Sequence, residues 1–239
     1  MHIGILETGR PPDELVKQHG SYADMIRVFL AREEPDWSFS VYPVIDDVFP
    51  QDVSLCQAWV ISGSRHGVYE NLPWMVRLKT FLGQAIAKSV PVAGICFGHQ
   101  ILAEVMGGVV RKSERGWGIG VQEYMLQTAD SSGSSLQLHA IHQDQVVVCP
   151  PGATVLASSS FCPYAMLAYG NKALGIQAHP EFSRDFEEDL LLLRRGHTLP
   201  PDLVDQALTR LGTEKVKADS AALARHISTF IKAGICQTS

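Results

Sequence analysis

The chain has 239 residues, enough for one domain with a substantial hydrophobic core. It carries 20 basic and 25 acidic side chains, a formal charge of -5, and their even mixture leaves no basic face for a nucleic acid. The five cysteines are odd in number, widely spaced and without a Cys-x-x-Cys pair, which argues against a disulfide framework or structural zinc and favours the reducing cytoplasm. We expect no signal peptide and no membrane span, because every apolar run is short.

Short apolar runs alternate with amphipathic stretches in the N-terminal part of the chain. The runs are typical of strands covered on both faces and lie at residues 3–6, 39–44, 58–61 and 90–95. The stretches at residues 21–33 and 74–88 are typical of helices, the first with a capping pattern at Ser21 and Asp24. This alternation predicts an α/β fold, an open and mostly parallel twisted sheet with helices on both faces.

The pattern changes between residues 109 and 177, where β-type segments are joined by turns rich in Gly, Ser and Asp. We expect these segments to extend the same sheet in antiparallel fashion, at residues 121–127, 145–149, 154–159 and 173–177. After Glu181 the chain is helical, with a new helix start at residues 200–202. We therefore assign residues 1–239 to a single domain, with residues 183–239 as a helical C-terminal extension that covers part of the domain or makes a dimer contact.

The most distinctive segment ends the fourth apolar run, where Gly94 and Gly98 flank Cys96 two residues away on either side. A strand that turns sharply into a helix needs residues without a Cβ where the backbone is crowded, so this spacing is typical of a nucleophile elbow. The turn puts the cysteine at a helix N-terminus, where N–H groups and the helix dipole favour a thiolate. We predict that Cys96 is a nucleophile. We expect the other cysteines to be small buried hydrophobes: Cys56, Cys149, Cys162 and Cys236.

A cysteine nucleophile needs a base, and the base needs a third group that fixes its tautomer and orientation. His179 follows the apolar run 173–178 and precedes Pro180 and Glu181, so it lies at the end of a predicted strand. Alternate side chains of an extended segment share a side of the chain, which lets the carboxylate of Glu181 reach the ring of His179. We predict that His179 is the base and Glu181 its orienter.

Attack of a thiolate on a carbonyl creates an oxyanion that two fixed N–H donors must stabilise. One donor follows from the elbow itself and is the main-chain N–H of Phe97. We expect the second from the loop that follows the strand at residues 58–61, where Gly63 and Ser64 lie and the glycine lets an amide point inward.

Other polar residues keep two interpretations. His139, His142 and Asp144 suggest metal ligands, yet they lack a fourth donor at a suitable spacing, so we favour a loop that borders the cleft and predict no metal site. Arg65 and His66 follow the candidate oxyanion loop, where they either bind a substrate carboxylate or are ordinary solvated side chains.

With the elbow, the Ser-Gly loop and the His-Pro-Glu triplet in this order, the chain resembles the class I glutamine amidotransferases, whose triad is Cys-His-Glu. Gly94-Ile-Cys96-Phe-Gly98-His-Gln100 looks like the family's nucleophile motif residue for residue, and His179-Pro-Glu181 looks like its second signature. Further agreement lies in residues 61–64, 68–70, 107–108, 114–117 and 142–146. These resemble most closely the amidotransferase domain of GMP synthetase and the free-standing proteins similar to it, over residues 3 to about 181.

The resemblance implies a flavodoxin-like fold with the site at the carboxyl ends of the strands. It implies that Cys96 attacks the γ-carboxamide of glutamine and that His179, held by Glu181, protonates the departing ammonia. A water activated by the same ring would then hydrolyse the γ-glutamyl thioester. By carry-over Gln100 helps to bind the substrate. The family commonly has a second glycine where this chain has Ser64, which makes this donor a departure from the pattern. The chemistry requires no cofactor.

Three functions stay open at this point. In the first, the chain is a glutaminase that passes ammonia to a separate synthetase partner, because we expect no ATP-pyrophosphatase domain in this chain. Alternatively it is a γ-glutamyl peptidase or hydrolase that cleaves larger γ-glutamyl amides without a partner. The third alternative, a binding or regulatory module without useful turnover, fits the intact triad pattern least. The long helical tail favours the free-standing functions. The substrate is a small molecule in either enzymatic case, and a homodimer is left open.

Overall fold

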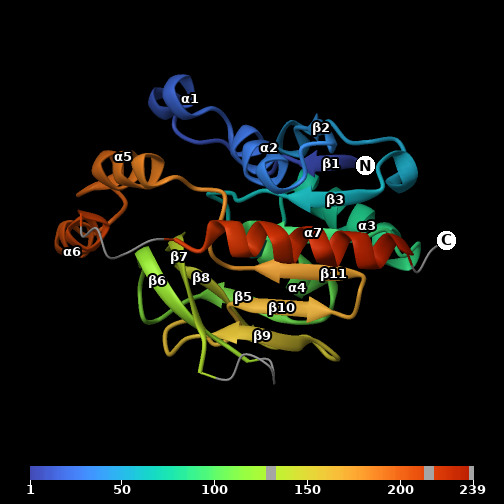
Figure 1. Cartoon of the computed structure of the whole chain (residues 1–239). Helices are drawn as coiled ribbons and strands as arrows, with labels where there is room; N and C mark the ends of the chain where they lie inside the picture. Colours follow the sequence, from blue (N-terminus) through green and yellow to red (C-terminus); the bar gives the residue numbers. More distant parts are fainter. Residues whose placement is uncertain (128–132, 213–217, 237–239) are drawn as a thin grey trace.

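The computed structural model describes residues 1–127, 133–212 and 218–236. Within these ranges the main sheet has nine strands, and its parallel half is followed by an antiparallel half (Figure 1). The strands lie side by side in the order β2 (Ser38–Tyr42), β1 (His2–Leu6), β3 (Ala58–Ile61), β4 (Val92–Ile95), β11 (Ala173–Ile176), β10 (Met166–Tyr169), β9 (Thr154–Ser158), β6 (Gly118–Leu126) and β7 (Ser135–His142). The pairings from β2 to β11 are parallel and those from β11 to β7 are antiparallel.

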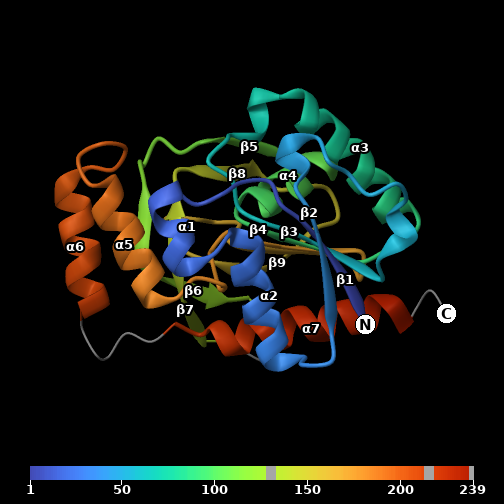
Figure 2. The ribbon, with the colours of Figure 1, turned by 90° about the horizontal axis from the view of Figure 1, so that it is seen from above.

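The parallel half is buried on both faces, as its continuous apolar runs predict. Alternate side chains of each strand enter different clusters, so that Val60 packs on one face while Trp59 and Ile61 pack on the other. The first face is covered by α2 (Tyr22–Glu33) and α7 (Ser220–Cys236), the second by α3 (Pro73–Ala87) and α4 (Phe97–Val105) (Figure 2). The expected arrangement of helices on both faces of an open sheet is therefore confirmed.

Strand β11 joins the two halves of the sheet. It pairs in parallel with β4, with Ile176 opposite Ile95, and antiparallel with β10. We expected residues 173–177 in the antiparallel extension alone, because a single strand's sequence does not reveal which neighbour it takes on each side. This position brings the segment that follows β11 next to the residue that follows β4.

The expectation that residues 145–149 extend the main sheet is wrong. The chain reverses at Gln143, and β8 (Asp144–Val148) pairs instead with β5 (Val109–Lys112), which leaves the end of α4. These two strands form a separate sheet. Val110 and Val146 of this ribbon are buried in the core cluster, whereas Val147 and Val148 are exposed, so the ribbon packs on the core with one side and reaches the surface with the other.

The helices after residue 183 do not form one unit. Helices α5 (Arg184–Arg194) and α6 (Pro201–Gly212) pack at one flank of the antiparallel half together with α1 (Asp13–His19), whereas α7 runs back along the parallel half (Figure 2). Leu223, Ile227 and Ile231 of α7 are fully buried in the main core. Three short 3-10 turns complete the described elements: η1 (Val44–Asp46), η2 (Val53–Leu55) and η3 (Val68–Glu70).

Local sequence signals account for the start of α2. The main-chain N–H of Asp24 donates to Ser21 Oγ at 3.1 Å, and the N–H of Ser21 donates to Asp24 Oδ2 at 3.1 Å. This reciprocal capping box satisfies two N–H groups that the helix itself leaves without acceptors. The capping pattern read from the sequence is confirmed.

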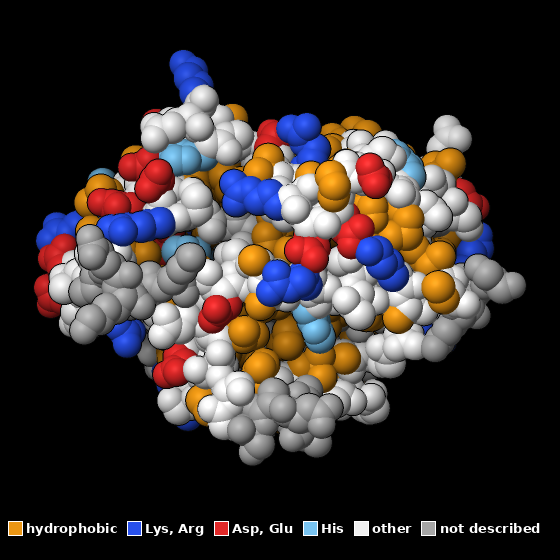
Figure 3. All heavy atoms as spheres, viewed as in Figure 1, with side chains coloured by type: hydrophobic (Ala, Val, Ile, Leu, Met, Phe, Trp, Pro, Cys, Tyr) orange, Lys and Arg blue, Asp and Glu red, His pale blue; other side chains and the backbone are white. Residues whose placement is uncertain are grey.

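The surface and the cysteines bear on the class of protein. Charged side chains of both signs are interspersed over the face seen in Figure 3, in line with the composition. All five cysteines are free thiols. Cys56 and Cys162 are buried as expected, whereas Cys149 is half-buried and Cys236, in the last turn of α7, is exposed. Among the described residues no helix combines the length and apolar character needed to cross a bilayer.

Candidate active site

The turn from β4 into α4 has the geometry of a strained elbow. Cys96, the residue between them, adopts a φ of 51° and a ψ of -101°, a region that L-residues with a side chain rarely occupy. A Cβ on Gly94 would lie 2.3 Å from the carbonyl oxygen of Gly98, and a Cβ on Gly98 would lie 2.7 Å from that of Ile61. Both flanking glycines are therefore required by close backbone approach, as the sequence suggested.

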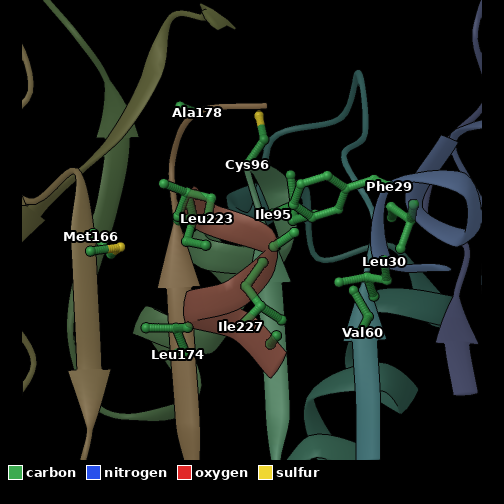
Figure 4. Close-up of a cluster of buried hydrophobic side chains, with 14 of the residues drawn as sticks. Phe29, Leu30, Val60, Ile95, Cys96, Met166, Leu174, Ala178, Leu223 and Ile227 are labelled. Carbon is green, nitrogen blue, oxygen red and sulfur yellow. The ribbon is translucent and has the colours of Figure 1, made fainter. Parts of the chain in front are cut away.

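The elbow directs the cysteine out of the core. Figure 4 shows Cys96 at the end of the hydrophobic cluster, with its sulfur pointing away from Ile95. The residue is only 6% exposed, yet it lines a large cleft. A group this enclosed meets a ligand in the cleft with few competing waters, which strengthens every charge interaction there.

His179 lies beside this sulfur, on the segment that follows β11. Its Nδ1 and Glu181 Oε1 are 2.8 Å apart, and both side chains are buried. The ring stacks on Phe182, with centroids 4.0 Å apart and an angle of 10° between the planes. Its main-chain N–H donates to the carbonyl of His139 at 2.8 Å. Since Nδ1 is engaged by the carboxylate, Nε2 is the ring atom left for the thiol.

Electrostatics distinguish His179 from the neighbouring buried histidines. Burial alone would lower the pKa of His179, but the negative charges of Glu181 and Cys96 and the hydrogen bonds with both raise it to about 10. Burial lowers the pKa of His99 to about 3 and that of His142 to about 4. At neutral pH His179 is therefore an imidazolium that can give up a proton, whereas the other two are neutral.

The loop after β3 brings main-chain N–H groups to the same place. A Cβ on Gly63 would lie 2.9 Å from His179 Cε1 and 3.8 Å from Cys96 Cβ. The N–H groups of Gly63, Ser64 and Phe97 donate to no acceptor within the described residues. They are the kind of unpaired donor that an oxyanion requires.

Thr8, a residue that the sequence analysis missed, fixes the direction of this loop. Its Oγ1 donates to the carbonyl oxygens of Ser62 and Gly63 at 2.8 and 3.2 Å, and its N–H donates to Ser62 Oγ at 2.9 Å. In a planar trans peptide the C=O of one residue and the N–H of the next point in opposite directions. With both carbonyls held toward Thr8, the N–H groups of Gly63 and Ser64 point away from it.

The cleft in front of Cys96 has a volume of about 790 Å³. Pockets that bury drug-sized ligands span roughly 300–1,000 Å³, so it holds more than one amino acid. Besides Cys96 and Gln100, its walls include four parts of the chain far apart in sequence: residues 9–13, residues 64–70, the strand ends around Lys112 and Asp144, and residues 193–198 at the end of α5 and just after it. Part of the C-terminal extension therefore forms a wall of the cleft.

The remaining polar residues singled out in the sequence separate into two groups. Arg65, His66, His142 and Asp144 line the cleft, and His66 Nδ1 lies 3.0 Å from a carboxylate oxygen of Glu70. His139 does not line it. Among the described residues no three His, Cys, Asp or Glu side chains are grouped as metal ligands would be.

His139 instead pairs with a carboxylate from another element. Its Nδ1 forms an ion-pair contact with Glu187 Oε2 on α5, and both side chains are buried. This second buried pair was missed, because its members are 48 positions apart and carry no common motif.

Gln100 lines the cleft beside Cys96, but its amide nitrogen is already engaged. Nε2 donates to the main-chain carbonyl of Asp144 at 2.9 Å and to Gln177 Oε1 at 3.2 Å. Gln177, two residues before His179, is fully buried with its Nε2 3.7 Å from Cys96 Sγ. The sequence analysis missed Gln177, although its place in the strand pattern puts it on the same side as His179.

This chain is similar to known proteins to different extents. The family model described as glutamine amidotransferase class-I matches residues 54–195. Gamma-glutamyl peptidase 5 of Arabidopsis thaliana is 33% identical over 180 residues, which are 71% of this chain and 71% of that protein. A glutamine-hydrolysing GMP synthase of Leptospira interrogans is 30% identical over 190 residues, which are 74% of this chain but 26% of that protein.

Among solved structures, a glutamine amidotransferase of Thermotoga maritima superposes with a TM-score of 0.72. The superposition covers 98% of this chain and 99% of the Thermotoga maritima chain, at 20% sequence identity. This similarity concerns the fold.

Proposed function

This chain belongs to the class I glutamine amidotransferase family, and from that premise we propose that it hydrolyses γ-glutamyl amides through a thioester on Cys96. The observation that supports the proposal best is the meeting of Cys96 with the buried His179–Glu181 pair beside the unpaired N–H groups of Gly63 and Phe97. Nucleophile, base, orienter and oxyanion donors are the parts that acyl transfer requires.

In the first half of the reaction, the thiolate of Cys96 attacks the γ-carbonyl carbon. A carbon–sulfur bond forms, and the carbonyl electron pair moves to oxygen, where the N–H groups of Gly63 and Phe97, and that of Ser64, stabilise the negative charge. When the tetrahedral intermediate collapses, the carbon–nitrogen bond breaks and the imidazolium of His179 donates its proton to the leaving nitrogen. The products are a γ-glutamyl thioester and the released amine or ammonia.

In the second half, His179 is neutral and accepts a proton from a water that attacks the thioester. The carbon–sulfur bond breaks, glutamate leaves, and the thiolate and imidazolium are restored. Glu181 holds the ring so that Nε2 faces the sulfur in both halves. The raised pKa of His179 suits a group that starts as an acid, because the proton is present before attack.

The cleft favours leaving groups larger than ammonia. Its volume of about 790 Å³ lies in the upper part of the range of roughly 300–1,000 Å³ for pockets that bury drug-sized ligands, so it has room for more than a glutamyl group. The similarity to a protein named gamma-glutamyl peptidase points in the same direction. We therefore take γ-glutamyl peptides as the substrate class, with glutamine as its smallest member.

A second candidate is a glutaminase that supplies ammonia to a synthetase partner. It is favoured by the similarity to a glutamine-hydrolysing GMP synthase, most of whose length this chain does not match. The chemistry at Cys96 would be the same, and the two functions differ in the leaving group and in their dependence on a partner.

A turnover panel with the purified chain tests the proposal. Glutamate release is measured from glutamine, from several γ-glutamyl dipeptides and from the corresponding α-glutamyl dipeptides. The proteins compared are the wild type, Cys96→Ala and, as a matched control, Cys149→Ala, which removes a half-buried thiol outside the cleft. We expect release from the γ-glutamyl dipeptides and from glutamine but not from the α-glutamyl dipeptides, its loss in Cys96→Ala and its retention in Cys149→Ala.

Each other outcome has a distinct meaning. Unchanged release by Cys96→Ala would reject the thioester mechanism. Turnover of glutamine but of no γ-glutamyl dipeptide would reject the substrate class and leave the partner-dependent glutaminase.

A further inference from the structure

Two buried glutamines connect the cleft to the reactive sulfur. Gln177 is fully buried and its Nε2 lies 3.7 Å from Cys96 Sγ, within the longer range of hydrogen bonds to sulfur. Its main-chain N–H donates to the carbonyl of Ala165 at 2.8 Å, which holds the residue in place. Neither the resemblance to the family nor the triad assigns this contact a role.

The direction of the Gln177 amide follows from acceptors that cannot donate. The main-chain carbonyl of Asp144 only accepts, so the atom of Gln100 that lies 2.9 Å from it must be the NH₂ nitrogen. The second hydrogen of that nitrogen points to the Gln177 amide at 3.2 Å, which must therefore present its oxygen. The NH₂ group of Gln177 is then the end that faces Cys96 Sγ.

We propose that Gln177 is a catalytic residue that donates a hydrogen bond to the Cys96 thiolate, and that Gln100 is the positioning residue that fixes the orientation of its amide. This inference rests on the proposed function in one respect, the identity of Cys96 as the nucleophile. No atom is transferred, because the amide proton stays on nitrogen throughout. The bond is strongest when the sulfur is charged, before attack and again as the sulfur leaves in the second half of the reaction.

The arrangement also limits what Gln100 can do for a ligand. Both hydrogens of its Nε2 are used within the protein, so only its oxygen is available to a substrate in the cleft. The substrate-binding role that the resemblance implies for Gln100 would thus be an accepting one, for example toward an amino group.

Thiolate reactivity toward iodoacetamide measures this bond directly. The rate of alkylation at Cys96 is followed by mass spectrometry from the acidic through the alkaline range for the wild type, Gln177→Met and Gln100→Met. Gln145→Met is the matched control, because Gln145 is a buried glutamine whose Nε2 has no partner among the described residues and which does not line the cleft.

Loss of the donor should move the midpoint of the pH–rate curve of alkylation upward. For Gln177→Met we expect a shift of about one pH unit and a fall in kcat/KM of about tenfold, which corresponds to one hydrogen bond to a charged group. Gln100→Met should shift the midpoint in the same direction by less, and the double variant should shift it no more than Gln177→Met alone, since both act through one bond. Gln145→Met should leave the curve unchanged.

The groups that titrate around the sulfur are the same in all of these proteins. They are His179 and Glu181 on the segment after β11, Tyr22 on α2, Tyr124 on β6 and Cys162 before β10. A difference between the curves therefore reports on the substituted amide.

The inference would be overturned if folded Gln177→Met alkylated like the wild type, or if Gln145→Met shifted the curve equally. Should Gln177→Met fail to fold, Gln100→Met carries the same test, because its side chain is one step further from the sulfur. Alkylation needs no substrate, so the result stands whether or not a γ-glutamyl compound is turned over. Glutamate release that persists in Cys96→Ala would instead contradict the proposed function, and alkylation would not be affected by that result.

Discussion

Two buried histidine–carboxylate pairs lie within the described parts of the chain, and they differ in what surrounds them rather than in the pair itself. In both, Nδ1 of the ring meets a carboxylate, and in both the second carboxylate oxygen, Glu181 Oε2 or Glu187 Oε1, has no partner among the described residues. His179 has a thiol and a cleft beside it, whereas His139 does not line the cleft. A buried histidine–carboxylate pair can take part in a reaction only when a reacting atom lies beside it and a ligand can reach that atom.

The two pairs also join different parts of the chain. His179 and Glu181 are two residues apart on one segment, so their bond fixes a ring orientation. His139 and Glu187 connect β7 to α5, and the carbonyl of His139 in turn accepts the N–H of His179 at 2.8 Å. The second pair therefore supports the backbone that carries the first, and the comparison assigns reactivity to one pair and mechanical support to the other.

The largest expected effect comes from removing the ring of the first pair. His179→Asn should lower kcat/KM by about a thousandfold or more, because it removes the proton donor and acceptor of both half-reactions. The variant should stay folded, as checked by its circular dichroism and a cooperative unfolding curve. A near-normal rate would show that another base serves and that the distinction between the pairs is wrong.

Breaking the second pair should cost stability instead. His139→Leu leaves Glu187 buried without its partner, which we expect to lower the free energy of unfolding by about 3–5 kcal/mol in urea titrations. Below its unfolding transition the variant should keep kcat/KM within about threefold of wild type.

The double variant His139→Leu, Glu187→Leu sharpens this test. It should recover much of the lost stability, since no unpaired charge remains. A strong loss of activity in a stable His139→Leu protein would mean that the second pair takes part in the reaction.

Of the two pairs, only His179–Glu181 lies beside the main-chain N–H donors of the Gly63 loop. Adding one methyl group at Gly63 tests that difference. In Gly63→Ala the new Cβ would lie 2.9 Å from His179 Cε1, and the ring is held by Glu181 and Phe182, so it cannot yield freely. We expect kcat/KM to fall by about 10–100-fold and the free energy of unfolding to fall by about 1–3 kcal/mol.

Gly83→Ala is the control for this substitution. Nothing lies within 4 Å of its added Cβ in the interior of α3, so it should stabilise the protein by about 0.5–1 kcal/mol and leave the rate unchanged. Equal rates for Gly63→Ala and wild type would place the oxyanion elsewhere.

The smallest effect concerns pH. The folded pKa of His179, about 10, lies above its ordinary value of 6.5, so its ion pair stabilises the fold fully below about pH 6.5 and loses that contribution as pH rises through about 10. Initial rates should accordingly fall about tenfold per pH unit above about pH 10, where the imidazolium is lost.

Urea unfolding curves provide the matching measurement. The difference in the free energy of unfolding between wild type and His179→Asn should shrink as pH rises from neutral toward 10. An alkaline limb that begins near neutral pH would contradict the charge environment assigned to His179.

Signals between near neighbours in the chain led correctly to much of the fold and to the elbow and the histidine–carboxylate pair that the structure brings together. The Gly94-x-Cys96-x-Gly98 spacing predicts a sharp turn, because at each glycine another part of the backbone comes too close for a Cβ. The apolar runs encode buried parallel strands because each strand exposes both faces to helices. His179 and Glu181 could be paired from spacing alone, since alternation along an extended segment is a local property.

Other features depend on which distant segments meet, and no local pattern contains that information. Gln177 and Cys96, which are joined by a hydrogen bond, are 81 positions apart in the sequence. Thr8 and the Gly63 carbonyl that it holds are 55 positions apart, and His139 and Glu187 are 48 positions apart. The separation of β8 from the main sheet and the wall that residues 193–198 add to the cleft arise in the same way.

The sequence by itself therefore determined the strand–helix alternation, the elbow at Cys96 and the pairing of His179 with Glu181, because steric and hydrogen-bond rules between chain neighbours suffice for all three. The tertiary structure alone decided how the Cys96 thiol is held, how the Gly63 loop is directed and how large the cleft is. These depend on side chains brought together by packing, whose distances and directions are set only when the whole core has formed.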